Sequence, residues 1–133
     1  METTNNNAIP NKERHGCVTA WLILMIISNS VTALLYFFAT DFITKNLPVQ
    51  ISNTMIIVLG IIGTANVIFS VLLLQWNKIG FWGFIITSIA ALVININIGM
   101  GIGTSLFGLV GIAILYGVLQ IKKEDVSTWE NLQ

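Results

Sequence analysis

Charged side chains are almost absent from the middle of this chain. Between Val18 and Ile121 only Asp41, Lys45 and Lys78 are charged, and all three fall between long apolar runs. Soluble domains contain about 25% charged residues, whereas this chain contains 9%. A charge at the centre of a spanning helix costs roughly 2.5–3.5 kcal/mol on insertion scales. The long uncharged runs therefore predict segments that cross a lipid bilayer.

Several functional groups are also missing. Cys17 is the one cysteine, so the chain can form no internal disulfide and has no C-x-x-C pair for thiol oxidoreduction. The uncharged runs contain no ionisable residue, which argues against a proton- or cation-coupled transporter. The formal net charge is zero, so no basic field favours nucleic acid. Without a grouped nucleophile, base and orienting residue, we expect no enzyme, no cofactor and no metal site.

The uncharged runs have the length needed to cross a membrane. A hydrocarbon core of about 30 Å needs roughly 20 helical residues. The run from Ile79 to Ile121 is about twice that length, so it must fold back, and the glycines at 99, 101 and 103 favour a turn. Backbone groups in lipid must be satisfied within each segment, which favours helices. We predict an all-α polytopic membrane protein with a transmembrane domain at 17–121 and spans at about 18–38, 51–74, 79–97 and 101–121.

The basic residues predict how the chain is oriented. One side of the membrane receives Lys12, Arg14, Lys78, Lys122 and Lys123, and the other receives only Lys45. We therefore expect both termini to be cytoplasmic, with a polar, flexible tail at 1–16 and a cytoplasmic C-terminal tail at 122–133. Short connections make sequential helices antiparallel neighbours, which predicts an antiparallel bundle of four transmembrane helices. We expect the C-terminal tail to be frayed, although Ser127 and Glu130 have the spacing of a capping box.

Small and polar residues form stripes on the predicted helices. In lipid, helices pack where small residues let backbones approach and polar side chains add hydrogen bonds. The candidate helix-packing residues are Gly60, Gly63, Gly83, Ala91, Gly108, Gly111 and Gly117. The candidate intramembrane polar contacts or pocket residues are Asn29, Thr32, Asn66, Ser70, Thr87 and Asn95. Asn29 and Asn66 fall at similar depths, so we predict that they hydrogen-bond to each other and fix the register of their helices.

Two functions remain open on this pattern. The first is a non-enzymatic integral membrane protein that acts through helix contacts, as a homo-oligomer or as a small subunit of a membrane-protein partner. It is favoured by the many small-residue faces. The second is a small-solute channel or carrier lined by the uncharged polar residues. In both cases the lipid bilayer is the surrounding medium.

Three segments together resemble a known group of proteins. They are HGCVTAWL at 15–22, WNKIGFWGF at 76–84, and GIAILYGVLQIKK at 111–123 followed by STWENL at 127–132. In these segments the chain resembles uncharacterised small bacterial membrane proteins with four predicted helices. The resemblance implies a multi-pass protein of the bacterial inner membrane. That group has no assigned activity, so the resemblance implies no site residues.

Overall fold

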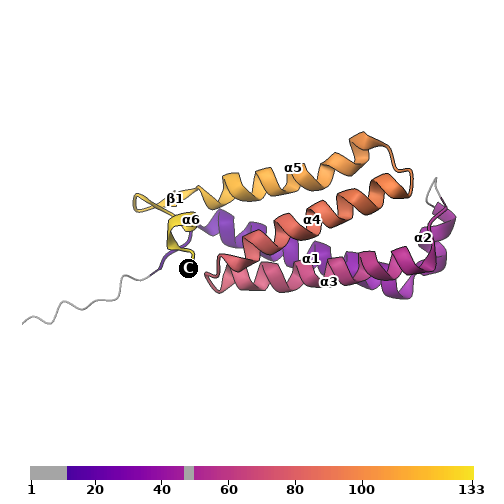
Figure 1. The fold of residues 1–133 in the computed structure, drawn as a ribbon. Coiled ribbons are helices and arrows are strands. Elements are labelled where there is room, and N and C mark those ends of the chain that lie inside the picture. The colour runs from indigo at the N-terminus through magenta and orange to yellow at the C-terminus, as the bar shows by residue number, and fades with distance from the viewer. Residues whose placement is uncertain (1–11, 47–49) are drawn as a thin grey trace, which may run out of the picture.

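The protein is mainly helical in the computed structural model, which describes residues 12–46 and 50–133. Residues 1–11, most of the predicted N-terminal tail, lie outside the described residues. Figure 1 shows long helices running side by side, with the start of α1 and the C-terminus at one end, here called the terminal end. The helices before the C-terminal tail are α1 (Gly16–Phe38), α2 (Thr40–Asn46), α3 (Asn53–Leu74), α4 (Ile79–Asn97) and α5 (Ile102–Leu119).

Three of these helices, α1, α3 and α4, are long and apolar enough to cross a membrane. Helix α5 has 18 residues, and its stretch Ser105–Leu119 is a shorter apolar helix by the same measure. Large apolar side chains face outward, including Phe38, Phe107 and Ile86, which are 83%, 73% and 68% exposed. Water would penalise so much exposed apolar surface. The all-α prediction is confirmed, and the helices have the character of membrane segments.

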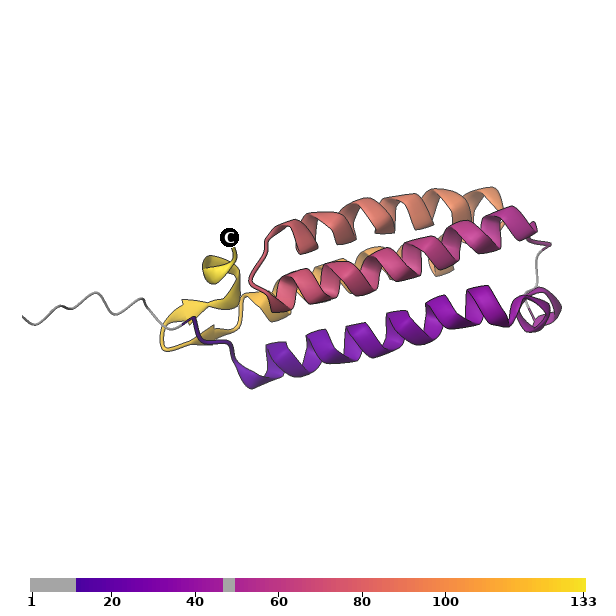
Figure 2. The same cartoon turned by 90° about the horizontal axis from the view of Figure 1, so that it is seen from below.

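Helix α2 occupies part of a connection for which the sequence predicted no helix. Helix α1 ends at Ala39, whose ψ of 35° departs from the helical range, and the chain turns sharply there. Figure 2 views α2 nearly end-on, so it runs across the end of α1. Asp41 lies in its first turn and Lys45 in its last, which suits the helix dipole. Short-range electrostatics therefore favour a helical turn in this connection.

The turns between the later helices use left-handed backbone. Gly99 has φ of 80° after α4, where the sequence predicted a glycine turn. Between α3 and α4, Trp76 has φ of 65°. There the Asn77 N–H donates to Leu72 O at 2.9 Å and the Trp76 N–H donates to Leu73 O at 3.2 Å. This is a Schellman motif with tryptophan in the position usually taken by glycine.

The buried core lies toward the terminal end. It consists of Val18 and Leu22 of α1, Leu73 of α3, Phe81 and Phe84 of α4, Leu115 and Leu119 of α5, and Leu132 of the tail. We call these residues the terminal cluster. Helix α1 packs closely against α3, α3 against α4, and α4 against α5, whereas α1 and α5 touch only sparingly. The helices are thus well joined in sequence order and loosely joined between the first and the last.

The C-terminal tail is folded, which corrects the expectation of a frayed segment. Strands β1 (Lys122–Lys123) and β2 (Val126–Ser127) pair as an antiparallel hairpin, followed by the helical turn α6 (Thr128–Asn131). The predicted capping box is present. The Lys78 N–H donates to Gln133 O at 2.6 Å, and the Gln133 N–H donates to Trp76 O at 2.8 Å. We call residues 122–133 the tail clasp, because these bonds fasten them to the α3–α4 turn.

Candidate functional site

A cavity of about 240 Å³ lies between the long helices, and we call it the central pocket. Its wall consists of Trp21, Met25 and Asn29 of α1, Asn66 of α3, Phe84 and Ser88 of α4, and Gly108, Gly111, Ile112 and Leu115 of α5. Among the residues that the structure describes, none that lines this pocket is charged. The wall is mainly apolar, with two amides, one hydroxyl and one indole as its polar groups. It can bind an uncharged molecule but carries no group suited to covalent chemistry on one.

Asn66 is held by a hydrogen bond between α3 and α4. The hydroxyl oxygen of Thr87 lies 2.6 Å from Asn66 Oδ1, 3.0 Å from Gly83 O and 3.1 Å from Phe84 O. The shortest distance suits O–H···O geometry and falls below the range of about 2.7–3.2 Å for N–H···O. The single hydroxyl hydrogen therefore goes to Asn66 Oδ1. Nδ2 of Asn66, with two hydrogens, has no acceptor among the described residues.

In Asn29 the amide oxygen, rather than the amide nitrogen, lacks a hydrogen-bond partner among the described residues. Its Nδ2 donates to Met25 O, one turn earlier in α1, at 2.8 Å. Its Oδ1 accepts no hydrogen bond from any described residue. The indole N–H of Trp21 is buried and, within the described ranges, also lacks a partner. The pocket thus has unused donors and an unused acceptor in apolar surroundings.

The predicted hydrogen bond between Asn29 and Asn66 is wrong. Each amide forms a hydrogen bond with a different residue. Asn29 donates to Met25 O in its own helix, and Asn66 accepts from Thr87 of α4. The register contact therefore joins α3 to α4 rather than α1 to α3. Asn29 and Asn66 still line the same pocket, and Thr87 is hydrogen-bonded to Asn66. The structure therefore brings together three of the predicted polar residues.

The other predicted polar residues lie elsewhere. Ser70 is buried in α3 and donates to Asn66 O at 2.9 Å, which supports the helix rather than the pocket. Asn95 is half-buried near the end of α4, and its backbone carbonyl accepts from the Met100 N–H. It lines neither the central pocket nor the second cavity described below.

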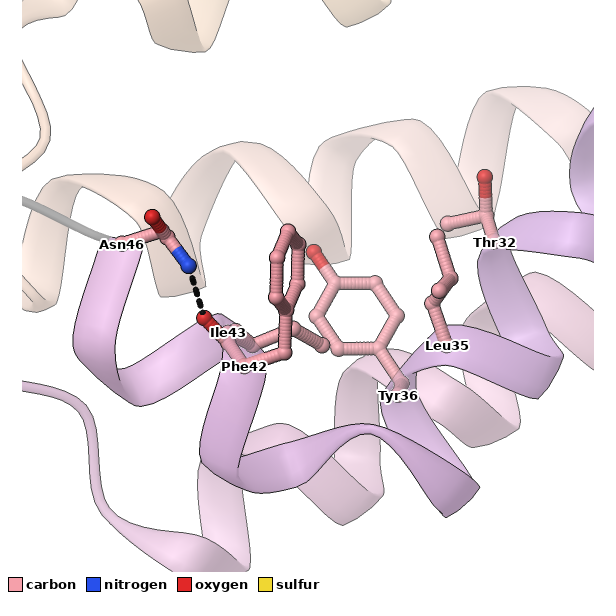
Figure 3. A pocket seen from close by; sticks show the side chains of 6 residues that line it. All are labelled: Thr32, Leu35, Tyr36, Phe42, Ile43 and Asn46. Atoms are coloured by element: carbon pink, nitrogen blue, oxygen red, sulfur yellow. Dashed lines mark hydrogen bonds between the residues drawn. The ribbon is translucent and has the colours of Figure 1, made fainter.

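Thr32 lines a second cavity, of about 250 Å³, at the corner between α1 and α2. Figure 3 shows the Tyr36 and Phe42 rings near each other in this corner. The Asn46 amide donates to Phe42 O at 2.7 Å, and Thr32 donates to Ser28 O at 2.8 Å. Because these polar groups bond within their own helices, the corner offers few free groups to a ligand.

The predicted helix-packing residues divide into two groups. A Cβ on Gly60 would contact the Phe37 ring at 2.9 Å, and one on Gly63 would contact Ala33 at 3.3 Å. A Cβ on Gly83 would collide with the Phe69 ring. Close approach of α3 to α1 and α4 therefore depends on these three glycines. Ala91, further along α4, is half-buried.

The glycines of α5 do not make the close helix contacts that the sequence predicted. A Cβ on Gly108, Gly111 or Gly117 would meet nothing within 4 Å among the described residues. Gly108 and Gly111 border the central pocket, and Gly117 does not. The reason is geometric: α5 turns its leucines, Leu115 and Leu119, into the terminal cluster and leaves its glycines facing open space.

Charged groups gather at the terminal end, away from the pocket. The Arg14 guanidinium donates to Leu73 O at 2.9 Å and Leu74 O at 3.2 Å, and it lies 4.0 Å from the Trp76 ring centroid. Burial lowers the pKa of Arg14 from its usual value. This contact neutralises the negative end of the α3 dipole and braces the left-handed Trp76.

The tail clasp adds further contacts at this end. Trp129 packs edge-on against Phe81 and Tyr116, with ring centroids 5.0 Å and 5.3 Å away. Lys78 Nζ lies 4.5 Å from the Trp129 ring centroid. Lys123 pairs with Glu13 at 2.6 Å. The clasp therefore seals the terminal cluster from outside, and the cluster separates the clasp from the pocket.

The described residues contain no group of three or more His, Cys, Asp or Glu that could hold a metal ion. Comparison with known protein families, with curated proteins and with solved structures found no match. Functional interpretation therefore rests on the geometry of this chain.

Several pocket residues were missed by sequence reasoning: Trp21, Met25, Phe84, Ser88, Ile112 and Leu115. A signal was present on α1, where Trp21, Met25 and Asn29 follow at steps of four and so share one face. A similar signal runs through positions 108, 111, 112 and 115 of α5. Spacing alone identifies such a face without showing whether it turns inward or toward lipid.

Proposed function

We propose that this protein is a four-span integral membrane protein that binds a small uncharged molecule in the central pocket, without covalent chemistry. The observation that carries the proposal is the pocket itself, which has a wall from all the long helices and unused amide groups on Asn29 and Asn66. Helix α5 serves as the fourth span, since its 18 residues extend about 27 Å at 1.5 Å per residue. The distribution of basic residues favours cytoplasmic termini, and the resemblance noted above favours a bacterial inner membrane.

The unused amide groups of Asn29 and Asn66 carry an energetic cost. A buried polar group without a hydrogen bond costs about 1–3 kcal/mol. Asn29 and Asn66 line the pocket and are half-buried, so the Asn66 Nδ2 group and the Asn29 Oδ1 atom, which have no partner in the described part of the chain, each carry part of this cost. An occupant that satisfies both recovers much of that cost. The pocket therefore favours a ligand with its own hydrogen-bonding groups over a purely apolar filling.

The terminal cluster argues for a pocket that is closed at one end. Phe84 and Leu115 belong both to the pocket wall and to this fully packed cluster. Beyond the cluster lies the tail clasp, with Leu132 buried against it. A solute in the pocket would have to displace this packing to leave at the terminal end. Binding is thus better supported than continuous conduction.

The test uses the full chain in lipid nanodiscs and ligand-observed NMR. The probes are urea, acetamide, glycerol, 1-hexanol and hexanamide. Gly111→Leu places a side chain into the pocket where the added Cβ has free space. Gly117→Leu is the matched control, because it lies on the same helix in equally open space but away from the pocket.

We expect at least one probe to receive saturation from the wild type and the Gly117→Leu variant but not from the Gly111→Leu variant. If no probe binds, or if binding is the same in all three proteins, the proposed function is refuted. Thermal unfolding of each variant checks that the loss of binding does not reflect loss of structure.

A second candidate function is association through α5, as a homo-oligomer or with a partner subunit. The observation favouring it is that Gly108, Gly111 and Gly117 are exposed and that no described residue lies within 4 Å of where a Cβ would be added. Small residues of this kind let a second helix approach closely. On this function Gly117→Leu should weaken association in lipid, measured by single-molecule photobleaching. A monomer at every protein density would argue against it.

A further inference from the structure

The central pocket is bordered by two long helices that are only loosely joined to each other, α1 and α5. Helices α1 and α5 meet mainly at the terminal cluster, through Val18, Leu22, Leu115 and Leu119. Beyond that contact, the exposed glycines of α5 and the half-buried Asn29 border the pocket on the α1–α5 side. The two helices approach each other much less than α1 approaches α3 or α4 approaches α5. The opening therefore lies between the first and the last long helix.

The depth of the pocket places this opening within the hydrocarbon. Asn66 lies eight residues before the end of α3, or about 12 Å from the terminal end at 1.5 Å per residue. In the antiparallel pair of α1 and α3, Ala33 lies against Gly63, so Asn29, one turn earlier in α1, is level with Asn66, which lies about one turn later in α3. Both depths fall near the middle of a core of about 30 Å. A ligand that reaches the pocket through this opening must first dissolve in the bilayer.

The free polar groups define what such a ligand must present. Asn66 Nδ2 is a donor that needs an acceptor, and Asn29 Oδ1 is an acceptor that needs a donor. Ser88, on the same wall, supplies a hydroxyl that can do either. A carboxamide carries a carbonyl oxygen and an N–H hydrogen on adjacent atoms. A carboxylate or an ammonium would bring an unpaired charge into hydrocarbon, because no lining residue is charged.

The size and apolar wall of the pocket define the rest of the ligand. A cavity of about 240 Å³ has the volume of about eight water molecules at roughly 30 Å³ each. This is the scale of a molecule with roughly eight to ten non-hydrogen atoms. Trp21, Met25, Phe84, Ile112 and Leu115 supply the apolar wall. A chain of six to eight carbons matches both the volume and the wall.

We infer that the central pocket takes a short-chain carboxamide amphiphile that enters from the bilayer between α1 and α5, its amide group meeting Asn29 and Asn66. This inference rests on the proposed function and names the ligand class for the same pocket. The ligand carbonyl accepts from Asn66 Nδ2, and its N–H donates to Asn29 Oδ1. Its chain lies against Met25 and Ile112.

The experiment is photolabelling of the full chain in nanodiscs. The probe is a six-carbon primary amide with a diazirine on its chain. Its controls are the methyl ester with the same diazirine, which can accept but not donate a hydrogen bond, and the corresponding alkyl diazirine without a polar group. We expect labelling on peptides that contain Met25 or Ile112, with the amide favoured over the alkyl probe by about tenfold, which corresponds to about 1.4 kcal/mol.

The variants separate recognition from folding. Asn29→Leu removes the Oδ1 acceptor, which no described residue uses, and the Nδ2 group, which donates to Met25 O within the same helix. This substitution should cut amide labelling to the level of the alkyl probe. Asn66→Leu should do the same, but it also breaks the bond to Thr87, so its thermal unfolding is measured in parallel. Gly111→Leu should abolish labelling by every probe at this site, and Gly117→Leu should leave it unchanged.

Three results would overturn the inference. Equal labelling by the amide and alkyl probes would mean that the amides do not recognise the ligand. Unchanged labelling in Asn29→Leu would mean that its carbonyl takes no part. Binding of urea or acetamide without binding of hexanamide would mean access from water, and would refute the inference while leaving the proposed function intact. Failure of every solute to bind would instead refute the proposed function.

Discussion

The hydrogen bond between Thr87 and Asn66 is the polar contact that joins α3 to α4, and its removal has a calculable cost. Thr87→Val keeps the branched shape of the side chain and removes the hydroxyl. Thr87 is 8% exposed, so the hydroxyl that donates to Asn66 Oδ1 is buried. Side-chain hydrogen bonds within membranes average about 0.6 kcal/mol and reach about 1.7 kcal/mol. We expect Thr87→Val to lower the free energy of unfolding by an amount in this range, near the upper end because the contact is short, at 2.6 Å.

The assay is reversible unfolding by SDS in mixed micelles, arranged as a double-mutant cycle with Asn66→Leu. The cycle isolates the pairwise energy from the other effects of each substitution. Thr32→Val is the matched control, because the exposed Thr32 hydroxyl donates only to Ser28 O, within its own helix. It should change stability by less than about 0.5 kcal/mol. A coupling energy below about 0.3 kcal/mol, or an equal loss in Thr32→Val, would refute the reasoning.

Three further predictions concern packing and the tail clasp. Gly83→Ala should lower the free energy of unfolding by about 1–3 kcal/mol, because the added methyl group meets an aromatic ring of α3, whereas Gly117→Ala should equal or exceed the wild type in the same titration. Trp129→Ala should release the tail clasp, seen as faster hydrogen exchange at residues 122–133 while exchange in α3 stays unchanged. Hydrogen bonds from the backbone N–H and hydroxyl of Ser127 hold the pKa of Glu130 below its usual 4.5, so the stabilisation is present above that value and is lost as the pH falls through the lower folded-state pKa. Exchange in the tail, corrected for intrinsic rates, should therefore quicken as the pH falls below about 4.5, and Glu130→Gln, which can still form a capping box, should remove this dependence.

The helix boundaries were predictable because charge and polarity mark them. The uncharged run 79–97 coincides with α4, and the runs 18–38 and 51–74 differ from α1 and α3 by two residues at one end. The prediction 101–121 extends slightly beyond α5. Lipid penalises charge and unpaired backbone strongly, so the sequence locates the four long helices to within about two residues, although it does not reveal α2. The cost of a misplaced charge exceeds most tertiary effects at these positions.

The sequence could not predict which side of each helix packs against the other helices, for a physical reason. A helix in lipid is apolar all round, so hydrophobicity does not distinguish its inner face from its outer face. The prediction of a hydrogen bond between Asn29 and Asn66 therefore used depth alone. In the structure, α4 turns the face that carries Thr87 toward Asn66. The same ambiguity assigned Gly108, Gly111 and Gly117 to helix contacts that the structure does not contain. The tail clasp depends on contacts between 122–133 and the distant α3–α4 turn, which local pattern cannot reveal.

The way α5 is held links the pocket to the stability of this helix. Leu115 belongs both to the terminal cluster and to the pocket wall, so one contact sets the position of α5 and the shape of the pocket. A ligand that touches Asn29 on α1 and Ile112 on α5 adds contacts on the side where these helices are otherwise loosely joined. By mass action, a ligand at 100 times its Kd stabilises the bound arrangement by about 2.7 kcal/mol. Hexanamide should therefore slow hydrogen exchange in α5 more than in α3, which already packs against two neighbours. A ligand bound on the outer surface would give no such difference between the helices.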